Sequence, residues 1–227
     1  MSPMRPLPWT WLLGIALILA GHATRADQIW NVSLDTSKLL VNYTGPFALD
    51  FELVGSSGNT VTISNLAFGV GSPGPGSAFL TGGASGDLSS TVTLTDSTSF
   101  FSDFNQQFTP GATLTFTVDT TLIAPPPGGT PDNFSMVMFS AYDPVNGYNP
   151  STGTGGTPLP TTDPTGNNTF FNFNVNVPGQ TTVSSYPSSS GDITITVSSV
   201  PEPSSLVLAC LGTVGSIAGI VWRRLRR

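Results

Sequence analysis

Short runs in which apolar and polar residues alternate recur through the middle of this 227-residue chain. In the first run, Trp30, Val32 and Leu34 alternate with polar residues. Further runs of this kind cover residues 47–53, 60–64, 91–95, 113–118, 134–139, 171–177 and 193–197. A period of two residues is typical of a β-strand that buries one face. Because strand formers fill these runs and good helix formers are scarce, the sequence predicts an all-β domain.

Turns rich in glycine and proline separate the predicted strands, at residues 55–59, 72–76, 109–111 and 125–129. Short strands that follow one another without intervening helices predict an antiparallel β-sandwich, jelly-roll-like in type. The run 134–139 is apolar on both faces, which predicts a central strand.

Three phenylalanines depart from this pattern. Phe101, Phe104 and Phe108 follow the i, i+3, i+7 spacing of a short helix, and Pro110 and Gly111 are suited to end it. A bent strand is the competing interpretation. In either case we expect these side chains to lie in the core.

An uncharged apolar stretch of 19 residues covers positions 204–222. A helix rises about 1.5 Å per residue, so one of this length nearly crosses a hydrocarbon core of about 30 Å. The arginines that follow hold their end of a span in the cytoplasm; they are Arg223, Arg224, Arg226 and Arg227. The sole cysteine, Cys210, lies within the stretch, so the sequence predicts no disulfide framework.

Pro201, Glu202 and Pro203 stand immediately before this stretch. The order of tripeptide, apolar span and arginine cluster resembles the PEP-CTERM sorting signal of Gram-negative bacteria. The resemblance implies that an exosortase, a membrane-embedded cysteine transpeptidase, recognises the tripeptide and removes the tail. A plain single-span membrane anchor is the alternative.

The N-terminal residues have the features of a secretory signal peptide. Arg5 is the only charge before a short apolar run from Trp9 to Ala20, and small residues follow. We expect the Sec translocon and signal peptidase to act here, with cleavage after Ala26. Cleavage after Ala23 and an uncleaved N-terminal anchor are the alternatives.

These features predict three regions: a signal peptide at 1–26, a β-sandwich domain at 27–199 and a sorting signal at 200–227. The predicted route is export across the inner membrane, transient anchoring there, and then the cell surface or the extracellular matrix of a biofilm.

Charge limits the partners of the predicted domain. Residues 27–199 contain twelve acidic residues and a single basic one, Lys38, which gives a net charge of −11. Such a surface repels phosphate and anionic lipid, which argues against nucleic-acid binding, and it can attract divalent cations.

The same region contains no histidine, cysteine or arginine. Ser-His-Asp and Cys-His catalysis and histidine-based zinc sites are therefore excluded within it. Asp50 and Glu52 lie about 7 Å apart on one face of a predicted strand, a spacing compatible with carboxylate-based glycoside hydrolysis. We expect instead that both lie on the solvated face of an outer strand.

Two polar stretches are candidate binding sites. Asp163, Asn167 and Asn168 supply oxygen ligands around a glycine turn, as a Ca²⁺ loop does, although an Asx turn explains the same residues. The second stretch has tyrosines beside amide and carboxylate groups, which stack on and hydrogen-bond to sugars; its residues are Tyr142, Asp143, Asn146 and Tyr148. Tyrosines that simply cover one end of the sandwich are the competing interpretation.

Residues 45–168 also resemble one family of PEP-CTERM proteins. The matching segments are 60–65, 80–89, 109–111, 131–134 and 159–164. This resemblance implies a shared fold and carries no function, and residues 142–156 look like an enlarged loop.

The sequence thus predicts a non-catalytic exported protein of the cell surface or matrix. A lectin-like sandwich that binds exopolysaccharide is the second hypothesis, and a carboxylate-based glycoside hydrolase is the third.

Overall fold

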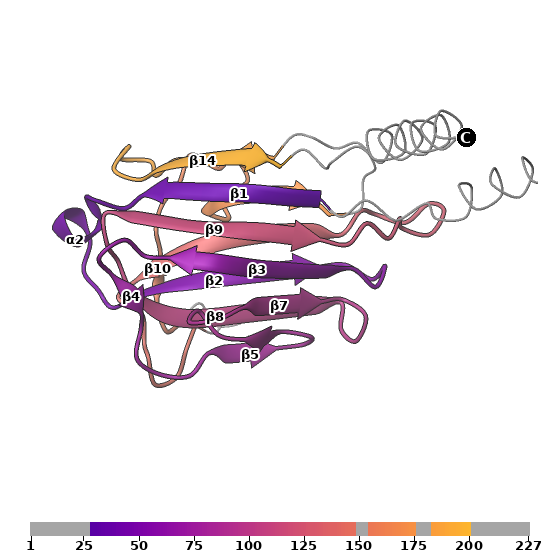
Figure 1. The fold of residues 1–227 in the computed structure, drawn as a ribbon, viewed down its shortest axis with the longest axis horizontal. Coiled ribbons are helices and arrows are strands. Elements are labelled where there is room, and N and C mark those ends of the chain that lie inside the picture. Colours follow the sequence, from indigo (N-terminus) through magenta and orange to yellow (C-terminus); the bar gives the residue numbers. More distant parts are fainter. Residues whose placement is uncertain (1–27, 149–153, 176–182, 201–227) are drawn as a thin grey trace, which may run out of the picture.

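In the computed structural model, residues 28–148, 154–175 and 183–200 are described, and their strands form two antiparallel sheets (Figure 1). The strands of the first sheet are β1 (Gln28–Asp35), β3 (Thr60–Ala67), β6 (Ser85–Gly86), β7 (Val92–Thr95), β9 (Thr113–Thr120) and β14 (Thr194–Ser199). Their order is β14-β1-β9-β3-β7-β6.

The second sheet contains the longer strands β2 (Phe47–Val54), β8 (Phe101–Thr109), β10 (Asn133–Ser140) and β12 (Thr169–Asn174). Its short strands are β4 (Ser72–Pro73), β5 (Phe79–Thr81), β11 (Thr157–Pro158) and β13 (Ser184–Ser185). The order is β13-β12-β10-β2-β8-β4, with β11 paired to β10 and β5 paired to β8. The single short helix of the described ranges is α2 (Leu39–Asn42).

The apolar residues of the alternating runs meet between the two sheets. Phe51 on β2 lies edge-on to Phe116 on β9, with ring centroids 5.6 Å apart. Trp30 on β1 lies 5.1 Å from Phe173 on β12, measured between ring centroids. Both contacts cross from one sheet to the other within a single buried core. The all-β expectation is therefore confirmed, and the packing is consistent with an antiparallel sandwich.

The run 134–139 occupies the position that its sequence predicts. It forms β10, which pairs with β12 on one side and with β2 on the other. Phe134, Met136 and Met138 point into the core, whereas Val137 and Phe139 point to the outer face of the second sheet. The outer face is apolar at Val137 and Phe139 because Tyr142 and Tyr148 pack over these two side chains.

Residues 101–109 form the strand β8, so of the two interpretations of this segment the strand is confirmed and the helix is wrong. β8 pairs with β2 along its length, from Phe47 opposite Phe108 to Val54 opposite Phe101. Phe104 and Phe108 face the core, but Phe101 is half-buried on the opposite face and lies outside the core cluster. Long-range pairing with β2 outweighs the weak helical spacing of three residues.

Residues 141–148, here called the covering segment, lie over part of the outer face of the second sheet. Backbone hydrogen bonds from Ala141 to Thr44 and from Tyr142 to Pro46 fix its start beside β2. Its tyrosines then pack on apolar side chains of the outer face, in a second small cluster made of Ala48, Val137, Phe139, Tyr142, Phe79 and Tyr148. Part of the predicted enlarged loop therefore packs on the outer face of the second sheet.

Gly147 allows the covering segment to approach β5 closely. Its φ is +70°, and a Cβ atom there would lie 2.6 Å from the ring of Phe79. Both the positive φ and this close contact require glycine.

Across the described ranges, none of the helices has the length and apolar character needed to cross a membrane. The predicted signal peptide at 1–26, the predicted span at 204–222, the tripeptide 201–203 and the terminal arginines all lie outside those ranges.

Candidate binding site on the outer face of the second sheet

Neighbouring strands bring polar side chains together on the outer face of the second sheet. Phe51 and Leu53 of β2 point inward, so Asp50 and Glu52 point outward. The antiparallel register sets Ser135 of β10 opposite Glu52 and Asn172 of β12 opposite Ser135. A row of polar groups therefore crosses three strands.

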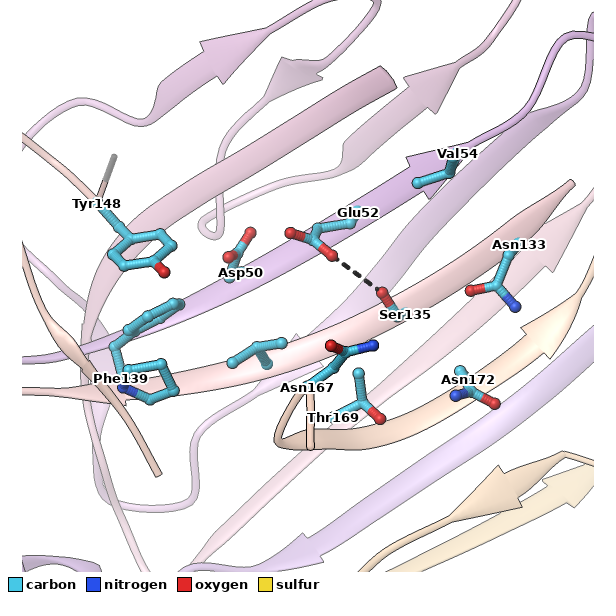
Figure 2. A pocket seen from close by; sticks show the side chains of 12 residues that line it. Asp50, Glu52, Val54, Asn133, Ser135, Phe139, Tyr148, Asn167, Thr169 and Asn172 are labelled. Carbon is cyan, nitrogen blue, oxygen red and sulfur yellow. Dashed lines mark hydrogen bonds between the residues drawn. The ribbon is translucent and has the colours of Figure 1, made fainter. Parts of the chain in front are cut away.

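These side chains line a pocket of about 280 Å³. Figure 2 shows its lining residues, which are Asp50, Glu52, Val54, Asn133, Ser135, Val137, Phe139, Tyr148, Pro158, Asn167, Thr169 and Asn172. The Ser135 hydroxyl donates a hydrogen bond of 3.2 Å to Oε2 of Glu52. This bond orients the Glu52 side chain along the pocket.

The two ends of the pocket differ in character. Tyr148 and Phe139 form one end, with ring centroids 4.2 Å apart (Figure 2). Asn133 and Asn172 lie at the other end, and the carboxyl groups of Asp50 and Glu52 lie between (Figure 2). The arrangement combines an aromatic wall with amides, hydroxyls and carboxyls, which is the usual composition of a small-molecule site.

A third carboxyl group stands beside the pocket, on β8. Asp103 lies opposite Glu52, and Asn105 lies opposite Asp50. Asp50 is 1% exposed and Asp103 is 6% exposed, so both carboxyls are removed from water.

Burial raises the pKa of all three carboxyls, and repulsion from neighbouring carboxyls raises it further for Asp50 and Glu52. Burial is the largest cause for Asp50, and the neighbouring Asp103 adds to it. Burial and Asp103 also raise the pKa of Glu52, against a smaller opposing effect of the Ser135 hydrogen bond. Burial raises the pKa of Asp103, which Asp50 partly offsets by sharing its proton. The cluster therefore retains a proton under conditions where an exposed carboxyl has lost it.

Several buried polar atoms in this region have no hydrogen-bond partner within the described ranges. They are Oδ1 of Asp50, Oδ1 of Asp103, both side-chain polar atoms of Asn105 and the hydroxyl of Tyr142. Leaving such groups unpaired costs about 1–3 kcal/mol each. Each such group calls for an explanation, and a bound water or ligand that supplies the missing partner is one.

The expectation that Asp50 and Glu52 lie on the solvated face of an outer strand was wrong for the strand and for Asp50, whereas Glu52 is half-buried. β2 is a central strand between β10 and β8, and the covering segment shields the outer face at Asp50. Alternation predicted correctly that the two carboxyls share one face, but it carries no information about what lies above that face.

The predicted sugar-contacting residues separate in the structure. Tyr148 lines the pocket, whereas Tyr142 is buried between the covering segment and the outer face of the sheet and does not line the pocket. Asp143 accepts hydrogen bonds from the backbone amides of Val145 and Asn146 and from the Asn146 side chain. Asp143 and Asn146 therefore stabilise a turn, and neither lines the pocket.

The predicted Ca²⁺ ligands do not converge. Both carboxylate oxygens of Asp163 accept hydrogen bonds, from the backbone amides and hydroxyls of Thr165 and Thr169. Burial raises the pKa of Asp163, but these bonds outweigh it and the net pKa is lowered. Asn168 accepts a bond from the Thr161 amide, and Asn167 lines the pocket instead. This geometry is the Asx-turn alternative, and the described residues hold no group of three acidic, histidine or cysteine side chains arranged for a metal.

Sequence reasoning missed Asp103 and Asn105, and it missed the amides at the far end of the pocket. Asp103 and Asn105 lie in the segment for which a helix was one interpretation, and residues two apart in a helix do not share a face. As part of a strand, the same spacing places both on the outer face, so the helical interpretation concealed this signal.

Comparison with known proteins matches one part of the chain. Residues 199–227 match the family model described as the PEP-CTERM protein-sorting motif. No curated protein and no solved structure matches the chain. The resemblance of residues 45–168 to one PEP-CTERM protein family therefore stays a prediction. The chain carries a PEP-CTERM protein-sorting motif at residues 199–227, the mark of an exported protein that an exosortase processes at the membrane on its way to the cell surface.

Proposed function

We propose that this protein is a non-catalytic component of the cell surface or extracellular matrix, delivered there by exosortase-dependent sorting. The match to the sorting motif, which begins at the last residue of β14, carries the proposal. In it, the signal peptide at 1–26 is cleaved, the span at 204–222 is a transient anchor and the arginines from Arg223 to Arg227 keep the tail in the cytoplasm.

The arrangement of β1 and β14 is compatible with processing of both ends at one membrane. Ser199 lies opposite Trp30, and the Val200 amide donates a hydrogen bond of 2.8 Å to the Ile29 carbonyl. The first and last strands of the sandwich thus meet at one end. Both targeting segments join the body at that end, so the folded body can rest beside one membrane surface during processing.

Replacement of Glu202 by alanine tests the sorting step. We expect Glu202→Ala to accumulate as an uncut form in the inner membrane, because the recognised tripeptide has lost its only charge. Cell fractionation and intact mass of the wild type, the variant and an exosortase-deficient strain measure this outcome. Ser205→Ala, two residues beyond the tripeptide, is the matched control and should be processed normally. Normal release of Glu202→Ala would contradict the proposal.

The composition of the folded body supports a non-catalytic role. Residues 28–200 have no histidine, cysteine or arginine, so the common nucleophile–base pairs cannot form within them. Hydrolysis by Asp50 and Glu52 is the remaining enzymatic hypothesis, since both line the pocket. Release of reducing sugar from secreted polysaccharide by the wild type, but not by Glu52→Gln, would favour that hypothesis over ours.

Binding to matrix polysaccharide is a second candidate function, and the pocket favours it. Its aromatic end and its row of amide, hydroxyl and carboxyl groups match the two surfaces of a sugar ring, one apolar and one polar. Pull-down of the secreted, processed protein on polysaccharide from its host tests this function. Absence of binding there would leave sorting as the whole of the proposed function.

A further inference from the structure

The carboxyl cluster at the pocket, which retains a shared proton until a cation displaces it, has no basic partner within residues 28–200 besides the distant Lys38. Lys38 is the single basic residue of positions 28–200, and it lies near Asp35 at the end of β1 in the other sheet. Asp50 and Glu52 line the pocket and Asp103 stands beside them. Buried carboxyl groups normally have a cationic or hydrogen-bond-donating partner, because an unpaired buried charge is costly.

One carboxyl oxygen that lines the pocket meets no donor with hydrogen-bond geometry. Asp50 is 1% exposed, and its Oδ1 has no hydrogen-bond partner among the described residues. Glu52 has the Ser135 hydroxyl on Oε2 and retains free acceptor capacity. The Asp50 and Glu52 carboxyls therefore retain free acceptor capacity toward the pocket, which a donor group of a ligand would satisfy.

An ammonium group meets this need better than a hydroxyl group. It offers three donors and one positive charge, whereas a hydroxyl offers one donor and no charge. A charge-assisted hydrogen bond to a carboxylate is about twice as strong as a neutral one. The positive charge also relieves the repulsion among the three carboxyls, which a neutral ligand does not.

The size and walls of the pocket suit a single ring. Its volume of about 280 Å³ is just below the range of drug-sized ligand sites, which is about 300–1,000 Å³. Tyr148 and Phe139 offer an apolar surface on which the C–H face of a sugar can stack. Asn172 and Asn133 at the opposite end can bond to ring hydroxyls.

We infer that this pocket binds an amino-sugar unit with a free ammonium group, the ammonium being held between Asp50 and Glu52. The inference rests on the proposed role in the polysaccharide matrix and names the sugar class that the pocket takes. It predicts preference for de-N-acetylated over N-acetylated amino-sugar chains.

Calorimetric titration of the secreted, processed protein tests the inference. The probes are a glucosamine tetramer and an N-acetylglucosamine tetramer, which differ only in acetylation of the nitrogen. We expect the glucosamine tetramer to bind at least about tenfold more tightly, because only it carries the charged donor.

Two variants separate the pocket from general charge attraction. Glu52→Gln keeps the shape and can still accept from Ser135, and we expect it to weaken binding by about tenfold or more. Asp192→Asn removes one negative charge outside the pocket and should bind as the wild type does. A circular-dichroism melt of each variant verifies that it is folded.

Equal affinity for the two tetramers would overturn the inference, as would no binding of either or equal weakening by Glu52→Gln and Asp192→Asn. Displacement of the tetramer by Ca²⁺ at millimolar concentration would point to a cation as the true occupant and would overturn it too. None of these results bears on sorting, since fractionation and intact mass test that step without a sugar.

Discussion

Two aspartates at one end of the sandwich illustrate how single residues shape this protein. Asp132 is fully buried, and it accepts hydrogen bonds from the Ser56 amide, the Ser57 hydroxyl and the Asn59 side chain. Asp96 accepts from the Ser57 amide and lies next to Asp132. Burial first, and then Asp132, raise the pKa of Asp96 to about 6. Protonated Asp96 can donate to Asp132, which ionised Asp96 cannot.

Asp96→Asn tests this pair. In the unfolded chain an aspartate has a pKa of about 3.9, so the folded protein binds more protons between that value and about 6. Stability from Asp96 is complete below about pH 4 and is lost as the pH rises to about 6. An asparagine donates to Asp132 and accepts from Ser57 at every pH. We therefore expect the melting temperature of the variant to fall less between pH 4 and 7 than that of the wild type, as measured by circular dichroism.

Asp192→Asn is the matched control for this experiment, because it removes the same charge from another part of the chain. We expect it to retain the wild-type decline. An unchanged pH profile in Asp96→Asn would show that Asp96 and Asp132 do not share a proton.

At the scale of elements, β8 shows how tertiary pairing decides between two local patterns. Its phenylalanines have the spacing of a helix, yet the segment pairs with β2 over its whole length. Phe104 thereby becomes fully buried against Phe51, with ring centroids 6.1 Å apart. Phe100, immediately before the strand, is 65% exposed. The strand therefore predicts opposite roles for two nearby phenylalanines.

Phe104→Ala and Phe100→Ala measure that difference. Removal of a buried phenylalanine costs about 3–5 kcal/mol in the free energy of unfolding, because it leaves a cavity as well as losing burial. An exposed position changes it by about 0.5 kcal/mol or less. Urea unfolding of both variants gives the two values. Similar losses from both would mean that this segment does not form the strand described here.

The molecule as a whole is strongly acidic, and its carboxyl groups fall into two kinds: those whose pKa is raised and those whose pKa is lowered in the folded state. Burial raises the pKa of Asp50, Glu52, Asp103 and Asp96. The contribution of these groups to the stability of the fold is therefore present at low pH and is lost as the pH rises. Hydrogen bonds lower the pKa of Asp35, Asp87 and Asp143, so their stability is lost only as the pH falls below about 4. The two groups leave a stability maximum between these windows.

We therefore expect the processed protein to be most stable near pH 4–5, below the usual optimum of about pH 5–8. At pH 7, added salt should raise the melting temperature, because it screens the repulsion among the acidic residues. Thermal melts across pH, with and without 0.5 M NaCl (roughly a 4 Å screening length), measure both effects. A melting temperature that climbs steadily from pH 5 to 7 would contradict this account.

The amino-acid sequence by itself determined most of the longer strands, which of their residues share a face, and the presence of the sorting motif. Residue spacing contains this information, because alternation follows from the backbone geometry of a strand and the sorting motif is contiguous. Trp30, Phe51 and Phe134 could be assigned to a buried face on that basis.

Only the tertiary structure decided which strands are neighbours and what covers the outer face of the second sheet. Asp50, Asp103 and Ser135 come from three separate strands, and pairing between distant segments brings them together. The covering segment then removes Asp50 from water, although alternation alone suggests a wet face. Strand order and loop packing depend on the sum of many long-range contacts, and no local pattern records that sum.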